Sequence, residues 1–185
     1  MQRIVIPHFS GGAATRNLAQ RIAEGCEQAG LANAQLISVD ALSQTDWQTL
    51  EQSDAIIFGT PTYMGGVAAP MKAFMDQTAS FWAEQRWADK LAAGFTCGAN
   101  TAGDKLATLQ HLAIFAAQHG MIWVGQNMVG VVGRPDQGAV NPDGAWLGLA
   151  ATTPPQTTPQ ISPADAETAR LFGARIAKAA HRWKL

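Results

Sequence analysis

A chain of 185 residues is long enough for a single domain, residues 1–185, with a hydrophobic core of its own. Hydrophobic residues make up 47% of the sequence and charged residues only 15%, which excludes intrinsic disorder and suggests that a partner subunit or a ligand covers part of the surface. The formal net charge is -1, so the chain has no basic field to attract nucleic acid or an anionic membrane.

The chain is expected to be a cytoplasmic protein without a metal site. The apolar run at residues 4–6 is too short for a signal peptide, and the run at residues 112–117 is too short to span a bilayer. Cys26 and Cys97 are expected to be two reduced thiols. Neither their spacing nor that of the histidines matches a metal-binding pattern.

Short apolar runs alternate with helical stretches along the chain. Five apolar runs predict β-strands, at residues 3–7, 34–39, 55–58, 91–96 and 121–124. Four stretches with helical periodicity predict helices, at residues 15–29, 70–78, 104–119 and 162–183. Their expected end signals are Pro70 and Ser162 at helix starts and Gly30 and Gly120 after helix ends. Residues 130–159 are rich in Gly, Pro, Thr and Asn and are predicted to form one long loop.

The alternation of strands and helices predicts an α/β protein with a parallel sheet and helices on both faces. In such sheets a ligand binds outside the carboxyl ends of the strands, where the strand order reverses. Three loops follow strands at that edge, at residues 9–15, 60–69 and 98–104. They consist mainly of small, neutral residues, as a closely fitted planar ligand requires.

The first loop joins a strand to the start of a helix. Free backbone N–H groups and the helix dipole favour a phosphate at such a place. Ser10, Thr15 and Asn17 offer additional side-chain hydrogen bonds. The loop contains neither the Gly-Lys-Ser/Thr of a Walker motif nor the GxGxxG of a dinucleotide site. The alternative is an ordinary strand-to-helix turn with Thr15 as the helix cap.

The second and third loops offer surface for a flat ring. Pro61 stiffens the exit from the third strand, and the Gly65-Gly66 pair permits close approach of the backbone. Tyr63 and Met64 present flat, polarisable side chains. The alternatives are a glycine-rich loop with a core methionine for the second loop and a flexible turn capped by Asp104 for the third.

His8 and His119 are the candidate catalytic histidines. His8 ends the first strand and His119 ends a helix, where the dipole favours a cation. A hydrogen-bonded structural role is the alternative for both. His111 and His181 are expected at exposed helix positions. No GxSxG motif occurs, which argues against a serine hydrolase.

The most specific stretch of the sequence runs over residues 54–72, DAIIFGTPTYMGGVAAPMK, and continues through residues 74–78 and 81–83. His119-Gly120-Met121 follows at the matching distance, and Gly144-Ala145 also fits. With these residues the chain resembles the flavodoxin-like fold. It is more closely similar to the tryptophan-repressor-binding-protein (WrbA) type of NAD(P)H:quinone oxidoreductase and to related FMN reductases, over essentially its whole length.

The resemblance implies a flavodoxin-like three-layer sandwich whose five-stranded parallel sheet has the order 2-1-3-4-5. It also implies FMN as the cofactor and NAD(P)H as the electron donor. The expected cofactor-binding residues lie in the three loops: Ser10, Gly12, Ala13, Ala14, Thr15 and Asn17; Pro61, Thr62, Tyr63, Met64 and Gly65; Ala99, Asn100, Thr101, Ala102 and Gly103. His119 matches a flavin-contacting histidine and is the candidate catalytic residue. Trp82 matches a tryptophan that helps to form the nicotinamide or quinone site across a subunit contact.

The expected function is therefore an FMN-dependent oxidoreductase that passes electrons from NAD(P)H to a quinone or another small acceptor. The alternatives are a flavodoxin-like electron carrier with no small-molecule substrate of its own and a relative that has lost the cofactor. Low surface charge, Trp82, Trp87 and the loop at residues 130–159 suggest a homodimer with shared sites. A homotetramer is the alternative assembly.

Overall fold

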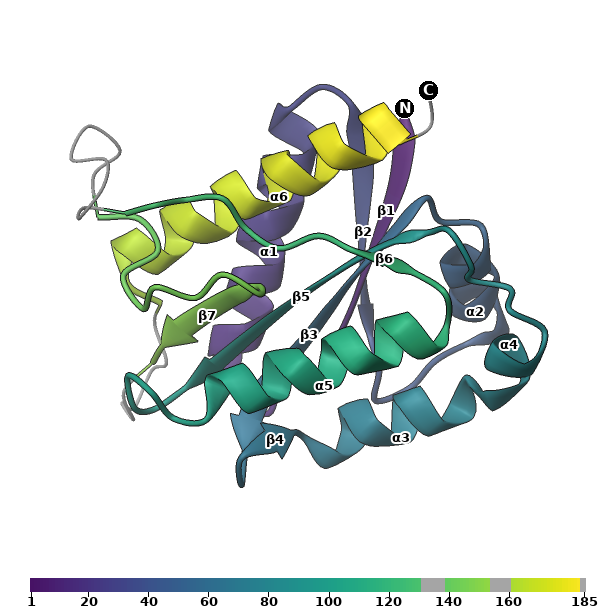
Figure 1. Ribbon diagram of the computed structural model, residues 1–185, viewed down its shortest axis with the longest axis horizontal. Coiled ribbons are helices and arrows are strands. Elements are labelled where there is room, and N and C mark those ends of the chain that lie inside the picture. Colours follow the sequence, from purple (N-terminus) through teal and green to yellow (C-terminus); the bar gives the residue numbers. More distant parts are fainter. Residues whose placement is uncertain (131–138, 154–160, 184–185) are drawn as a thin grey trace.

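The computed structural model describes residues 1–130, 139–153 and 161–183. Over these residues the sheet has seven strands, and its main path runs in the order β2-β1-β3-β5-β6 (Figure 1). The strands of that path are parallel and have the bounds β1 Gln2–His8, β2 Ala32–Ser38, β3 Ala55–Tyr63, β5 Leu91–Gly98 and β6 Ile122–Trp123. The order predicted for the five strands is confirmed.

The position next to β5 is shared by two short strands. β6 pairs with Leu91 and Ala92 at the start of β5, and β7 (Leu149–Thr152) pairs with residues 95–98 at its end. The prediction of one continuous loop over residues 130–159 is wrong at β7, whose four residues form a strand because β5 offers them an open edge. Residues 131–138 and 154–159 of that predicted loop lie outside the described residues.

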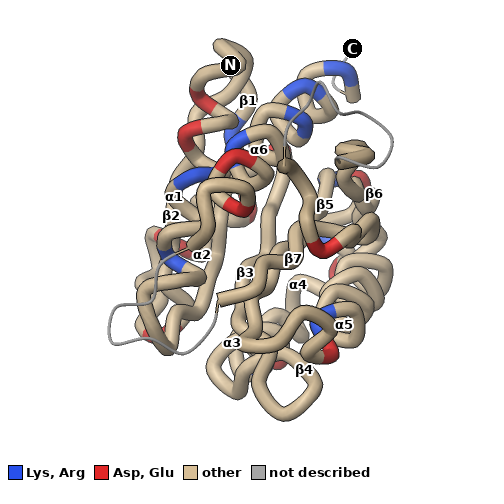
Figure 2. The backbone as a smooth tube through the Cα atoms, turned by 90° about the vertical axis from the view of Figure 1, so that its left-hand side faces the viewer, with Lys and Arg blue, Asp and Glu red and all other residues tan. Residues whose placement is uncertain are grey.

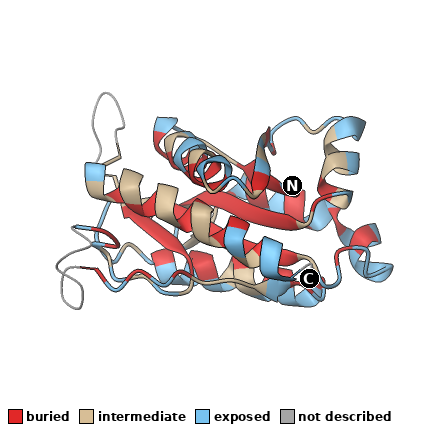
Figure 3. Cartoon of the chain, turned by 90° about the horizontal axis from the view of Figure 1, so that it is seen from above, coloured by how far each residue is buried: buried red, intermediate tan, exposed pale blue. Residues whose placement is uncertain are grey.

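Helices cover both faces of the sheet and complete three layers (Figures 1 and 3). On one face α1 (Ala13–Gln28) and α6 (Pro163–Trp183) pack against strand residues such as Ile4 and Ile6. On the other face α2 (Gln44–Glu51), α3 (Ala69–Gln77), α4 (Ala79–Ala83) and α5 (Lys105–Gln118) pack against alternate residues such as Val5 and Phe58. Successive side chains of a strand point to opposite faces, so one apolar run fills both cores. The flavodoxin-like fold is confirmed. None of the helices in the described parts of the chain is long and apolar enough to cross a membrane.

The predicted helix ends are set by local residues. Gly30 and Gly120 both have a φ of 68°, the left-handed conformation that glycine adopts readily after a helix. Pro70 lies in the first turn of α3. The Ser162 Oγ accepts a hydrogen bond from the Asp165 N–H at 3.0 Å and so caps α6. These four predictions are confirmed.

The short helices α2 and α4 are absent from the sequence-based prediction. Leu50 is the buried residue of α2, so the apolar periodicity of that helix is weak. Its available signal is a capping box, in which the Ser43 Oγ accepts from the Asp46 N–H at 3.2 Å and the Asp46 carboxylate accepts from the Ser43 N–H at 2.8 Å. The five residues of α4 are too few to show a helical period.

Two alternatives and one expectation about single residues are overturned by the structure. α1 begins at Ala13 with Gly12 as its N-cap, so Thr15 is not the helix cap. Asp104 has a left-handed φ of 55°, and its side chain makes no capping hydrogen bond to α5. Trp87 was expected at a subunit interface but is fully buried, with ring centroids 5.4 Å from Phe81 and 6.4 Å from Phe115. Its indole fills the core beneath α4 and α5.

α1 and α6 cross closely because glycines stand at the crossing point. A Cβ on Gly25 would lie 1.8 Å from the Arg170 carbonyl oxygen, and one on Gly173 would lie 2.0 Å from the Ile22 carbonyl oxygen. The Cys26 thiol also donates to the Gly173 carbonyl across the same contact. Because the clashing atoms are backbone, they cannot move aside as a flexible side chain does.

We predict that Gly173→Ala lowers the free energy of unfolding by about 1–3 kcal/mol, the usual cost of overpacking. Without the clash the same change inside a helix would stabilise the protein by about 1 kcal/mol, because alanine is the better helix former. Urea denaturation measures the difference. Gly66→Ala is the matched control, since a Cβ there meets no atom within 4 Å. Equal stability of the Gly173→Ala protein and the wild type would contradict the close crossing.

Candidate functional site

The three predicted loops meet at the carboxyl edge of the sheet, because they follow the adjacent parallel strands β1, β3 and β5. The Phe9 N–H donates to the Gly59 carbonyl at 2.9 Å, and the Tyr63 hydroxyl lies 2.4 Å from where a Gly11 Cβ would be. Figure 2 looks toward this edge and shows few charged residues around β3, β4 and β7. The loops therefore form one largely uncharged surface, as predicted.

The first loop presents backbone donors at the start of α1. Gly12 is the N-cap in an extended conformation, and no side chain caps the helix. The Ser10 hydroxyl is turned onto its own loop, where it donates to the Gly12 carbonyl and accepts from the Arg16 N–H at 3.3 Å. Uncapped N–H groups and the positive end of the helix dipole make this turn suitable for a phosphate group.

The Thr15 side chain points away from that turn, toward β5. The Thr15 side chain is buried, and its Oγ1 lies 3.3 Å from the Cys97 Sγ on β5. Asn17 is half-buried on α1. Burial raises the pKa of the Cys97 thiol, so this cysteine is a neutral hydrogen-bonding group behind the loop.

The second loop is the tip of a hairpin between β3 and β4 (Gly66–Val67). Tyr63 pairs with Gly66, and the two residues between them, Met64 and Gly65, have φ values of 48° and 81°. Positive φ at both positions is the mark of a two-residue hairpin turn. The turn leaves the Met64 side chain fully exposed and Tyr63 half-exposed beside the first loop. Both side chains are available to a flat ligand.

Behind the hairpin, Thr62 is turned inward. Its Oγ1 lies 2.8 Å from the Oγ1 of Thr96 on β5 and 2.8 Å from the Oγ1 of Thr108 on α5. Pro61 is buried in β3, opposite Cys97. Thr62 and Pro61 therefore support the loops from behind, and Tyr63, Met64 and Gly65 form the exposed part.

The third loop exposes a run of small side chains, which are those of Ala99, Asn100, Thr101 and Ala102. It ends on Gly103 and Asp104, both with left-handed φ. Lys105 follows and is only 3% exposed, with its ammonium paired to Asp143 and 2.6 Å from the Thr152 Oγ1. This buried ion pair anchors the loop to the segment that leads into β7.

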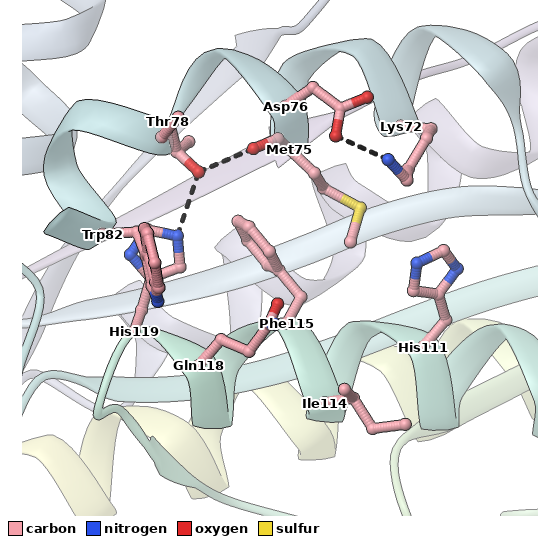
Figure 4. Close-up of a pocket in the computed structure, with 11 residues that line it drawn as sticks. Lys72, Met75, Asp76, Thr78, Trp82, His111, Ile114, Phe115, Gln118 and His119 are labelled. Carbon is pink, nitrogen blue, oxygen red and sulfur yellow. Dashed lines mark hydrogen bonds and ion pairs between the residues drawn. The ribbon is translucent and has the colours of Figure 1, made fainter.

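The catalytic candidate His119 and the substrate-site candidate Trp82 lie away from these loops. Trp82 and His119 line a groove of about 320 Å³ between α3, α4 and α5, on one helical face of the sheet (Figure 4). α5 begins directly after the third loop, and His119 directly follows its last residue. The 14 residues of α5 make a helix about 21 Å long at 1.5 Å per residue. Within one chain, His119 is therefore about one helix length from the third loop.

His119 is held in the wall of the groove and is 1% exposed. Its Nε2 lies 2.9 Å from the Thr78 Oγ1, and its ring centroid lies 4.8 Å from that of Trp87 and 4.7 Å from that of Phe115. Burial lowers the pKa of His119 below its ordinary value, so the ring is neutral at pH 7. Trp82, by contrast, is 51% exposed.

The remaining histidines are placed more simply. His8 is buried at the end of β1, its Nδ1 lies 3.2 Å from the Ile6 carbonyl oxygen, and burial lowers its pKa. This is the structural alternative foreseen for His8. His111 was expected to be exposed but is half-buried and lines the groove with His119. No group of three or more His, Cys, Asp or Glu in the described segments could hold a metal ion.

Comparison with known proteins assigns the family. A family model described as NADPH-dependent FMN reductase matches residues 9–135, which include all three loops and the groove. The chain belongs to this family. A crystal structure of a WrbA-like flavodoxin from Agrobacterium tumefaciens is 37% identical, with a TM-score of 0.78 over 98% of this chain and 99% of that one.

Two curated relatives cover nearly the whole chain. "Flavodoxin FldP" of Pseudomonas aeruginosa is 35% identical over 96% of both sequences. An "NAD(P)H dehydrogenase (quinone)" of Archaeoglobus fulgidus is 29% identical over 98% of this chain and 99% of its own. The family member described here thus has one relative named as a flavodoxin and one named as a quinone dehydrogenase.

The carboxyl edge fits FMN, the cofactor of the family. The uncapped turn at residues 11–15 offers several neutral donors to one phosphate, and the exposed residues of the other two loops offer apolar surface to the ring. The contact between Tyr63 and Gly11 leaves no space for a Cβ at Gly11, so the two loops form a single cradle.

We predict that Ala13→Asp weakens FMN binding at least 100-fold, by an order-of-magnitude estimate. Ala13 is the exposed first residue of α1, and two like charges about 4 Å apart near a protein surface repel by about 4 kcal/mol. Quenching of flavin fluorescence measures the affinity. Gln20→Glu adds the same charge two turns further along α1 and is expected to leave the affinity unchanged. Tight FMN binding by Ala13→Asp would place the phosphate elsewhere.

Proposed function

We propose that this FMN reductase family member is an FMN-dependent oxidoreductase that transfers electrons from NAD(P)H to a quinone or another small acceptor. The observation that carries the proposal is the uncharged cradle of three loops at the carboxyl edge of β1, β3 and β5, in a chain that belongs to this family. The named quinone dehydrogenase relative of similar length supports the choice of acceptor. The protein is proposed to act in the cytoplasm.

The chain's own residues would bind and orient the cofactor. The N–H groups of residues 11–15 would hold the phosphate, with Asn17 beside them. Tyr63, Met64 and the loop from Ala99 to Gly103 would line the ring. When bound, FMN supplies the redox chemistry, accepting two electrons from the nicotinamide and passing them to the acceptor. The neutral loop donors favour the negative charge that develops on reduction.

We further propose that the active site is completed by a second copy of the chain. Trp82 and His119 are too far from the third loop of their own chain to meet a flavin bound there. The groove that they line lies beside α5. Residues 106–118 of that helix contain no Asp, Glu, Lys or Arg, so its surface is uncharged. Leu106 and Ile114 on that helix are about 60% exposed. A homodimer that buries this surface would bring the groove of one copy to the flavin of the other.

The second candidate function is an electron carrier without a small substrate. It is favoured by the name of the Pseudomonas relative, which is 35% identical. A carrier that docks on basic partners is usually strongly acidic, whereas this chain has 13 basic and 14 acidic residues. The oxidoreductase is therefore the preferred proposal.

The enzyme proposal predicts quinone-dependent oxidation of NAD(P)H by the FMN-loaded protein. Because donor and acceptor would use one ring face in turn, double-reciprocal plots at several quinone concentrations should be parallel lines. Steady-state absorbance at the nicotinamide band measures this. A protein that binds FMN tightly but oxidises NAD(P)H only in the presence of a redox protein would instead support the electron carrier.

The shared site predicts complementation between two inactive variants. Ala13→Asp removes FMN but keeps the groove, whereas His119→Ala keeps FMN but removes the histidine. After the two are unfolded together and refolded, mixed dimers should regain part of the quinone reductase activity. A matched mixture of Ala13→Asp with Ala13→Asp/His119→Ala should stay inactive. If mixed dimers of Ala13→Asp and His119→Ala form but stay inactive, a site built from two copies is contradicted.

A further inference from the structure

We infer that Thr78 is a positioning residue that fixes the proton of His119 on Nε2, so that His119 presents Nδ1 as a hydrogen-bond acceptor. The part of His119 in turnover rests on the proposed function, whereas the position of its proton does not. The inference assigns a role to a residue outside the flavin loops, at the junction of α3 and α4.

The Thr78 hydroxyl has two partners and a single proton. Its Oγ1 lies 2.7 Å from the Met75 carbonyl oxygen and 2.9 Å from the His119 Nε2, as the dashed lines in Figure 4 show. A carbonyl oxygen can only accept, so the hydroxyl proton goes to Met75. The hydroxyl oxygen must then accept from His119, and Nε2 carries the hydrogen.

The opposite arrangement is unfavourable at this site. If Thr78 donated to His119, its oxygen would face the Met75 carbonyl oxygen at 2.7 Å with no proton between them. Thr78 is buried, so water cannot relieve that contact. The Met75 carbonyl already accepts from the Thr78 N–H at 3.2 Å and has no proton to offer, so the lone pairs of the two oxygens would repel each other.

The second ring nitrogen of His119, Nδ1, is buried and has no hydrogen-bond partner among the described residues. Trp87 and Phe115 pack against the ring, so it cannot turn freely to exchange its nitrogens. The other charged groups of the groove are Lys72 and Asp76, which pair with each other, and the half-buried His111 adds a titratable group. Nδ1 is therefore a buried acceptor without a partner among the described residues, behind the wall of the groove.

The Thr78 contact therefore acts on the His119 ring itself. It fixes the tautomer and the orientation of a ring that Trp87 and Phe115 hold in place. Because Nδ1 is buried, its role is to keep the ring neutral rather than to contact a ligand, and burial lowers the pKa of His119 in the same sense.

The test is nitrogen NMR of the FMN-loaded protein labelled with ¹⁵N-histidine. The chain has 4 histidines, and His119→Gln assigns the signal in question. At pH 7 we expect a protonated, pyrrole-type signal for Nε2 and an unprotonated, pyridine-type signal for Nδ1. A proton on Nδ1, alone or together with one on Nε2, would overturn the inference.

Thr78→Val removes the hydroxyl at nearly constant shape, and Thr78→Ser restores it. In Thr78→Val the ¹⁵N spectrum of His119 should show a mixture of the two tautomers. The flavin half-reaction that His119 serves should slow by about 3- to 10-fold, which corresponds to the loss of one neutral hydrogen bond. Thr78→Ser should recover both, and FMN affinity should stay unchanged throughout. Thr49→Val is the control, because the Thr49 hydroxyl also donates to a helix carbonyl, at 2.9 Å, but touches no histidine.

The outcomes separate the two proposals. A wild-type ¹⁵N pattern and wild-type half-reaction rates in Thr78→Val would overturn the positioning role. The expected ¹⁵N pattern in the wild type, combined with unchanged rates in His119→Gln, would support the tautomer assignment and contradict the part of His119 in the proposed function.

Discussion

The length of α5 is the constraint on which the rest of the site depends. The helix starts at the loop that would line the flavin ring and ends at His119, about 21 Å further on. Packing against β5 and the Phe58, Trp87 and Phe115 cluster holds it rigidly. A single chain therefore carries a cofactor cradle at the carboxyl edge of its sheet and, on one helical face, a groove with Trp82 and His119 about one helix length away. In the proposed homodimer a second copy would bring the two together.

The cradle itself follows from parallel strands that end beside one another. β1, β3 and β5 deliver three loops to one place, and the turn before α1 supplies N–H donors without a cation. The buried pair of Lys105 and Asp143 keeps its charges out of that surface while tying the third loop to the approach of β7. Rigid support with a neutral surface suits a cofactor that changes its own charge during turnover.

Much of this arrangement is predictable from the sequence, because it depends on residues that are close together in the chain, such as apolar runs and helix end signals. Buried strands such as residues 55–58 and end signals such as Gly30 and Ser162 are local, so the strands and the three loops are found from the sequence. The order of the sheet is implied by the family resemblance and is confirmed. β7 depends on an open edge of β5, and the Lys105–Asp143 pair joins residues far apart in the chain, so neither leaves a local signal. The direction of the Thr15 and Thr62 side chains is likewise set by contacts with β5 and α5. The FMN contacts of the individual loop residues stay predictions.

The most direct test of the shared site is a crystal structure of the protein with FMN bound. The account predicts the phosphate against residues 11–15 of one copy, and Trp82 and His119 of a second copy beside the exposed face of the same ring. A flavin bound in this cradle with its ring approached by no second copy, in a protein that is monomeric in solution and still reduces quinones, would contradict the account.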